Sequence, residues 1–104
     1  MKLDILFTWA AQVDMQRAFA VMEDAAEGAG VRLSETTDEL LGLTAQHPFI
    51  ARVWHSPVRR HVLERTCYGL FYVVEPRRLV VITFRDLRED PARLRQEILG
   101  RLPT

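Results

Sequence analysis

The sequence is almost free of lysine. Lys2 is the single lysine, so the other 13 of the 14 basic side chains are arginine, and 14 acidic side chains bring the formal net charge to zero. A neutral chain lacks the strong positive charge with which proteins bind nucleic acid irrespective of sequence. The charges are unevenly spread: residues 1–50 hold three basic and eight acidic side chains, and residues 51–104 hold eleven and six. The second half is therefore suited to a polar or acidic partner, because arginine binds carboxylates well.

Cysteine and long apolar runs are also scarce. Cys67 is the only cysteine, which excludes an internal disulfide and fits a reducing compartment. No apolar run reaches the roughly 18 residues that a transmembrane helix needs, and an acidic residue at position 4 is unlike a signal peptide. A chain of 104 residues has the length of one domain. We therefore expect a single cytoplasmic domain over residues 1–104 that does not associate with a membrane.

Patterns typical of metal and phosphate sites are missing as well. His47, His55 and His61 are scattered and do not have the spacing of zinc ligands, either with one another or with Cys67. The glycines form no phosphate-binding loop, since they lie at positions 28, 30, 42, 69 and 100. We expect neither a metal nor a cofactor.

Hydrophobic periodicity predicts one strand and then two helices. Residues 3–9 are rich in strand-forming side chains. From about residue 10 the apolar residues recur at helical spacing until Gly28 and Gly30. A second helix is expected from the low thirties to residue 46, with Thr36 and Glu39 as a capping box if it begins late. The proline at position 48 ends it. Two helices with so short a link form an antiparallel hairpin.

Three antiparallel strands are predicted next, over residues 58–65, 68–75 and 79–85. Residues 49–57 are expected to be a connector whose large apolar side chains tuck under the edge of the sheet. These side chains are Phe49, Ile50, Val53 and Trp54. The fold class is thus α+β, in the order β-α-α-β-β-β with a short C-terminal helix.

The middle strand is apolar on both faces. Tyr68, Leu70, Tyr72 and Val74 alternate with Gly69, Phe71 and Val73, and in the third strand Val80, Ile82 and Phe84 alternate with Leu79 and Val81. The helix hairpin can cover one face only. The second face needs the C-terminal helix, which Asp90 caps and Pro91 opens, a segment of a partner, or both.

Short patterns along nearly the whole chain are similar, in the same order, to those of a known family. They are AAQVDM at 10–15, LTAQHP at 43–48, IAR at 50–52, the arginine pair at 59–60, YGLFY at 68–72, the apolar strand at 79–84 and REDP at 88–91. On these patterns the chain resembles the RelE/ParE superfamily of type II toxin–antitoxin toxins, and within it the ParE-like branch.

The resemblance implies partners. A cognate antitoxin would wrap the toxin with its C-terminal segment, in a heterotetramer or a higher assembly. ParE-like members act on a protein target such as DNA gyrase, whereas RelE-like members are metal-independent endonucleases of ribosome-bound mRNA. A third alternative is a non-toxic member that acts only in protein assembly.

The residues favour a toxin that is not an enzyme. A RelE-type nuclease needs basic side chains around the phosphate and a tyrosine near the C-terminus for acid–base chemistry. Arg59, Arg65 and Arg85 are the candidate phosphate ligands for such a nuclease, but no tyrosine follows Tyr72 and no histidine lies near the C-terminus. Zero net charge also disfavours docking to a ribosome.

Six side chains are candidates for the surface that binds a target or an antitoxin. Arginines at a sheet edge can equally serve to prevent aggregation, and tyrosines on one strand face are often packing residues. The six are Arg59, Arg60, Tyr68, Tyr72, Arg85 and Arg88.

Overall fold

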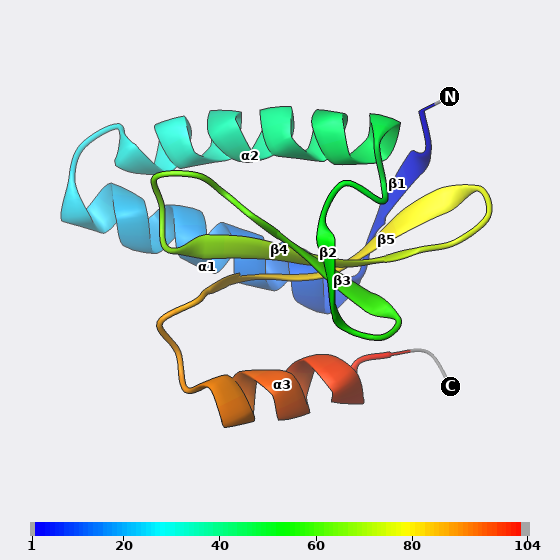
Figure 1. The fold of residues 1–104 in the computed structure, drawn as a ribbon. Coiled ribbons are helices and arrows are strands. Elements are labelled where there is room, and N and C mark those ends of the chain that lie inside the picture. Colours follow the sequence, from blue (N-terminus) through cyan, green and yellow to red (C-terminus); the bar gives the residue numbers. More distant parts are fainter. Residues whose placement is uncertain (1, 103–104) are drawn as a thin grey trace.

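A computed structural model describes residues 2–102 as one five-stranded sheet between two helical layers (Figure 1). The elements are β1 (Asp4–Phe7), α1 (Trp9–Ala25), α2 (Ala29–Gln46), β2 (Arg52–His55), β3 (Val58–Val62), β4 (Tyr68–Val74), β5 (Arg78–Asp86) and α3 (Pro91–Gly100). The strand order is β1-β5-β4-β3-β2; β1 runs parallel to β5, and the other neighbours are antiparallel. The predicted α+β class is confirmed, and the predicted elements occur in the expected order, with one further strand, β2, after the helix hairpin.

The helix hairpin is held at its turn by one side chain. Gly28 adopts a left-handed conformation with φ 80° and precedes α2. The Glu23 carboxylate of α1 accepts hydrogen bonds from the N–H groups of Gly28 (2.8 Å) and Gly30 (3.0 Å). Helix α2 therefore begins at position 29, so the late start that a capping box of Thr36 and Glu39 requires does not occur. Thr36 lies inside the helix, where its hydroxyl donates to the carbonyl of Arg32 (2.9 Å).

The segment predicted as a connector contains a strand, β2. It is four residues long and pairs only with β3, through an irregular register. Of its large apolar side chains only Trp54 packs inward, with its ring centroid 4.9 Å from that of Phe71. Phe49, Ile50 and Val53 are each more than half exposed. The prediction that they tuck under the sheet is wrong: Phe49 and Ile50 lie before β2, and Val53 lies in the outermost strand, opposite Arg59.

A β-bulge in β5 changes which face Phe84 occupies. Phe71 of β4 lies opposite Thr83, while the next residue, Tyr72, lies opposite Val81, so Ile82 is the extra residue. Simple alternation placed Phe84 beside Ile82. The extra residue instead moves Phe84 to the face covered by α1 and α2, which we call the hairpin face. This face also carries Tyr68, Leu70 and Tyr72, as predicted.

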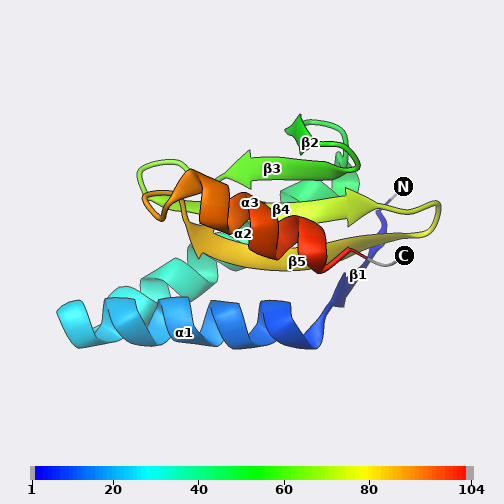
Figure 2. The same ribbon diagram turned by 90° about the horizontal axis from the view of Figure 1, so that it is seen from below.

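Helix α3 covers the opposite face, which we call the α3 face. Asp90 caps the helix as predicted, since its side chain accepts from the N–H of Ala92 (3.1 Å). Leu94 and Ile98 are buried against Phe71 and against neighbours on β5. Figure 2 shows α3 lying over β4 and β5, with β3 and β2 to one side. Part of the α3 face along β2 and β3 is therefore left without a helix. No helix within residues 2–102 is long and apolar enough to cross a bilayer.

Candidate functional site

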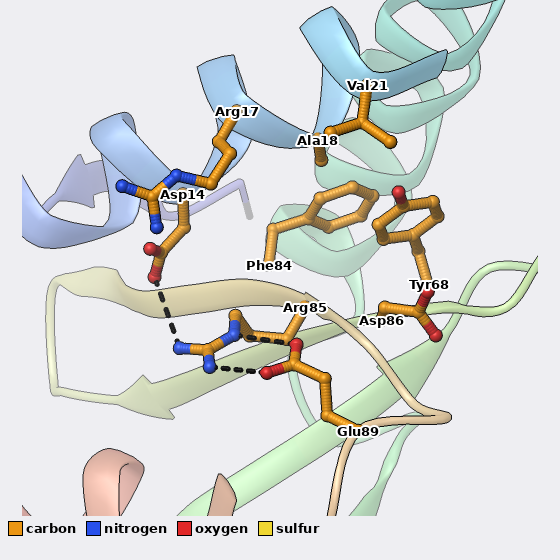
Figure 3. A pocket seen from close by; sticks show the side chains of 9 residues that line it. All are labelled: Asp14, Arg17, Ala18, Val21, Tyr68, Phe84, Arg85, Asp86 and Glu89. Carbon is orange, nitrogen blue, oxygen red and sulfur yellow. Dashed lines mark hydrogen bonds and ion pairs between the residues drawn. The ribbon is translucent and has the colours of Figure 1, made fainter. Parts of the chain in front are cut away.

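A cavity of about 280 Å³ lies between α1 and the end of β5 (Figure 3). One wall is apolar and the other is charged. The lining residues are Asp14, Arg17, Ala18, Val21, Tyr68, Phe84, Arg85, Asp86 and Glu89. Two of the six candidate residues, Tyr68 and Arg85, are thus part of one cavity. A mixed lining of this kind suits a side chain of a protein partner that has an apolar body and a polar end.

Tyr68 forms the apolar wall together with Phe84. Their rings are stacked, with centroids 5.1 Å apart and an interplanar angle of 5°. The β-bulge makes this pairing possible, because it brings Phe84 to the hairpin face. Tyr68 is only 6% exposed, and burial raises the pKa of its hydroxyl. Tyr68 is therefore neutral at physiological pH and shapes the cavity.

Arg85 is neutralised within the chain. Its guanidinium donates to both carboxylate oxygens of Glu89 (2.9 and 2.6 Å) and to Glu97 of α3 (2.8 Å). The bond from Arg85 lowers the pKa of Glu97, and the bonds to Glu89 raise the pKa of Arg85. The carboxylate of Asp14 lies 3.9 Å from the same guanidinium. A phosphate at Arg85 would have to compete with these carboxylates for the same donors.

Asp14 joins three elements. Its Oδ2 accepts from the Thr83 hydroxyl of β5 (2.5 Å) and from Arg101, just beyond α3 (2.6 Å). The Asp14 side chain is 7% exposed, and that of Arg101 is 26% exposed. Asp14 lies in a pattern that opens the first helix, and no local signal shows that its partner is 87 residues later in the chain. Sequence reasoning also missed Glu89 and Glu97 as partners of Arg85, and Arg17 as a lining residue of the cavity.

Arg88 does not line the cavity, but it is bound to Asp86, which does. Two hydrogen bonds join its guanidinium to the Asp86 carboxylate (3.1 and 2.8 Å), while the Arg88 side chain is 77% exposed. The hydrogen bond from Arg88 lowers the pKa of Asp86 from 3.8 to about 2. The hydrogen bonds thus keep the Asp86 carboxylate ionised opposite Tyr68, with its charge balanced by Arg88.

This shifted pKa predicts a pH dependence of stability. Because the pKa of Asp86 is lower in the folded chain, its contribution is fully present above about pH 4 and is lost as the pH falls through 2. We expect the Asp86→Asn variant to be less stable than the unsubstituted protein at pH 5, and the difference to shrink toward pH 2. Urea unfolding at a series of pH values measures it. A difference that stays constant over this range would contradict the assignment.

The other candidate residues lie elsewhere. Tyr72 is fully buried, and its hydroxyl donates to the carbonyl of Pro48 (2.8 Å). Arg59 donates to the carbonyl of Ala51 (2.7 Å), with its guanidinium 4.9 Å from the ring centroid of Phe49. Both contacts hold the segment after α2 against the sheet. Arg60 is exposed on the α3 face, next to Arg59 in β3.

The three candidate phosphate ligands of a nuclease are not brought to one place. Arg59 lies opposite Tyr72, on the hairpin face, whereas Arg85 lies opposite Gly69 and contacts α3. Arg65 is exposed in the turn between β3 and β4, at a left-handed φ of 63°. In residues 2–102, no group of three or more His, Cys, Asp or Glu side chains is placed to hold a metal ion.

Comparisons with known proteins agree with this fold. No protein-family model matches the sequence, and no curated protein matches it. Among solved structures, the chain is similar to a chain of one described as "Chromosomal ParDE TA system from P. aeruginosa", with a TM-score of 0.70 and 14% sequence identity. The similarity covers 82% of this chain and 96% of that chain. The fold expected from the resemblance to the RelE/ParE superfamily is therefore the fold that this chain has.

Proposed function

We propose that the chain is the toxin of a type II toxin–antitoxin system, a single ParE-like domain that acts in the cytoplasm. It inhibits growth by binding a protein target such as DNA gyrase, and a cognate antitoxin neutralises it. The observation that carries this proposal is the fold similarity to a chain of a ParDE system, which covers nearly all of that chain. The order of the short sequence patterns supports the same assignment.

The charges around the candidate arginines support binding over RNA cleavage. Arg85 is paired with two glutamates, Arg59 lies on the opposite face of the sheet, and Tyr72 is buried. A nuclease needs several cationic groups convergent on one phosphate, so that charge developing in the transition state is stabilised. The cavity at Tyr68 instead presents apolar and charged walls side by side, as protein interfaces do.

Expression from an inducible promoter without antitoxin tests the proposal. We expect growth arrest with filamentous cells and gyrase-dependent DNA damage. Rapid loss of translation, with cuts in ribosome-bound message that Arg85→Ala abolishes, would instead establish the mRNA endonuclease. Harmless overexpression together with tight binding to the antitoxin would establish a member that acts only in protein assembly.

Two exposed valines provide a matched test of the cavity. Val21 lines the cavity from α1 and is 56% exposed, whereas Val31 on α2 lies outside it and is 59% exposed. Val21→Glu should lower toxicity at least roughly tenfold, because it places a charge in an apolar contact. Val31→Glu should leave toxicity unchanged. Viable counts after induction, at equal protein levels, measure the toxicity of both variants. Equal effects of the two substitutions would show that the cavity is not part of the surface that causes toxicity.

A further inference from the structure

A second surface lies where α3 leaves the α3 face open. Arg52 of β2 and Arg60 of β3 are directly opposite each other in the register. Two hollows, of about 600 and 300 Å³, lie along these strands, and both are lined by Trp54 and Arg60. Arg52 lines the larger hollow, and Arg95 of α3 lines the smaller one. Arg60 thus lies between the two hollows, with Arg52 at the larger one and Arg95 at the smaller one.

These three arginines lack the carboxylate partners that five other arginines have. Arg78, Arg85, Arg88, Arg93 and Arg101 each lie within 4 Å of a carboxylate. Within residues 2–102, no such ion pair involves Arg52, Arg60 or Arg95. Like charges directly opposite in a sheet destabilise it. A bound anion between Arg52 and Arg60 would relieve this repulsion.

Apolar side chains lie among the arginines in both hollows. Ile50, Val53 and Val62 line the larger hollow and are each more than 40% exposed, while Leu87 and Leu94 line the smaller one. The only carboxylate in either lining is that of Glu64, in the larger hollow. A ligand that matches this surface carries acidic groups and apolar groups at close intervals. Acidic peptide segments have this chemistry.

A peptide fits better than a nucleic acid for two reasons. The Trp54 ring already packs edgewise against His55 and Phe71, with centroids 4.5 and 4.9 Å apart, so it is held within the protein. Single-stranded nucleic acids need aromatic rings that offer a free face to the bases. The chain also has zero net charge, which gives little long-range attraction for a phosphate backbone.

We propose that Arg52, Arg60 and Arg95 form the anion-binding centre of a surface that takes an acidic, apolar-containing peptide segment of a partner protein. Arg60 is the central residue, because it lines both hollows. That this segment is the tail of the antitoxin rests on the proposed function; the binding site itself does not. The surface is separate from the Tyr68 cavity, with which it shares no lining residue.

Fluorescence titration of the full chain tests this site. Trp9 is 79% exposed, so Trp9→Phe leaves Trp54 as the only tryptophan without disturbing the core. The probe is a short synthetic peptide of alternating glutamate and leucine. We expect a saturable change in Trp54 fluorescence, an affinity that falls with added salt, and an affinity reduced at least roughly tenfold by Arg60→Gln. Arg77→Gln, at an exposed arginine in the β4–β5 turn, should bind like the parent.

Three results would overturn the proposal. The first is that Arg60→Gln, shown by its urea midpoint to be as stable as the parent, binds the peptide as tightly as the parent does. The second is that a peptide with glutamine in place of glutamate binds as tightly as the original peptide, and the third is that a single-stranded RNA oligonucleotide binds through the same arginines more tightly than the peptide. None of these measurements depends on toxicity, so a harmless protein that still binds the peptide would refute the proposed function and leave this site intact.

Discussion

Replacing Asp14 with alanine should lower the free energy of unfolding by about 3 kcal/mol, the lower end of the cost of removing one partner of a buried ion pair. The substitution leaves the Thr83 hydroxyl, which is fully buried, without its acceptor. It also removes the carboxylate that Arg101 contacts at 2.6 Å. We take the lower end because the Arg101 side chain is 26% exposed and can be partly solvated in the variant.

Urea unfolding followed by circular dichroism measures this loss. The matched control is Asp24→Ala, on the same helix at an exposed position that forms no ion pair within residues 2–102. It should change the free energy of unfolding by less than about 0.5 kcal/mol. Hydrogen exchange adds a second measurement, because Asp14 links α1 to the end of α3. Exchange in α3 should quicken in Asp14→Ala, and unchanged exchange together with unchanged stability would contradict the role of this carboxylate.

Alanine at Gly30 should destabilise the protein by about 2 kcal/mol, as expected when an extra group is forced into a packed contact. A Cβ atom at this position would lie 2.4 Å from the carbonyl oxygen of Phe19 and 3.0 Å from the Cβ of Glu23. Both atoms belong to α1, and the first is backbone. The clash can be relieved only by moving α1 away from α2, which would weaken the bond from the Gly30 N–H to Glu23.

The same substitution at Gly42 should have the opposite effect on the free energy of unfolding. Gly42 is also inside α2, but a Cβ there meets no atom within 4 Å. Alanine is a better helix former than glycine by up to about 1 kcal/mol, so Gly42→Ala should stabilise the protein by up to that amount. Urea midpoints of the two variants measure the contrast. Two stabilising effects of similar size would mean that the helices are not in close contact at Gly30.

Strong local patterns explain why much of the fold could be predicted from the sequence. The apolar stripe of α1, the strand β4 with apolar residues on both faces, and the Asp90-Pro91 start of α3 are all present in the structure. Each depends on neighbours a few residues away. The wrong predictions concern features that depend on a residue far away in the sequence, or on a residue that no sequence pattern marks. The start of α2 depends on a carboxylate from α1, and the face of Phe84 depends on one extra residue in β5.

The candidate site, like the fold, could be predicted from the sequence only in part. Tyr68 could be chosen from the sequence because it lies in the YGLFY pattern on one strand face with Tyr72, and Arg85 because it ends the last predicted strand beside the C-terminal segment. Their surroundings could not, since Asp14, Glu89 and Glu97 come from a helix, a loop and another helix that the fold brings around Arg85. The charge state of an arginine site depends on such neighbours. Arg85, predicted as a phosphate ligand, is therefore neutralised by carboxylates of its own chain.

The α+β class, the helix hairpin and the two apolar faces of the central strands follow from the sequence alone, because periodicity is a local property of the chain. Which arginines are paired with carboxylates follows only from the folded structure. Arg85 contacts carboxylates of α1, of the loop after β5 and of α3, whereas Arg52 and Arg60 lie opposite each other in the sheet and Arg60 and Arg95 line one hollow. The physical reason is that the interaction of two charges depends on their distance in space, which spacing along the chain does not reveal.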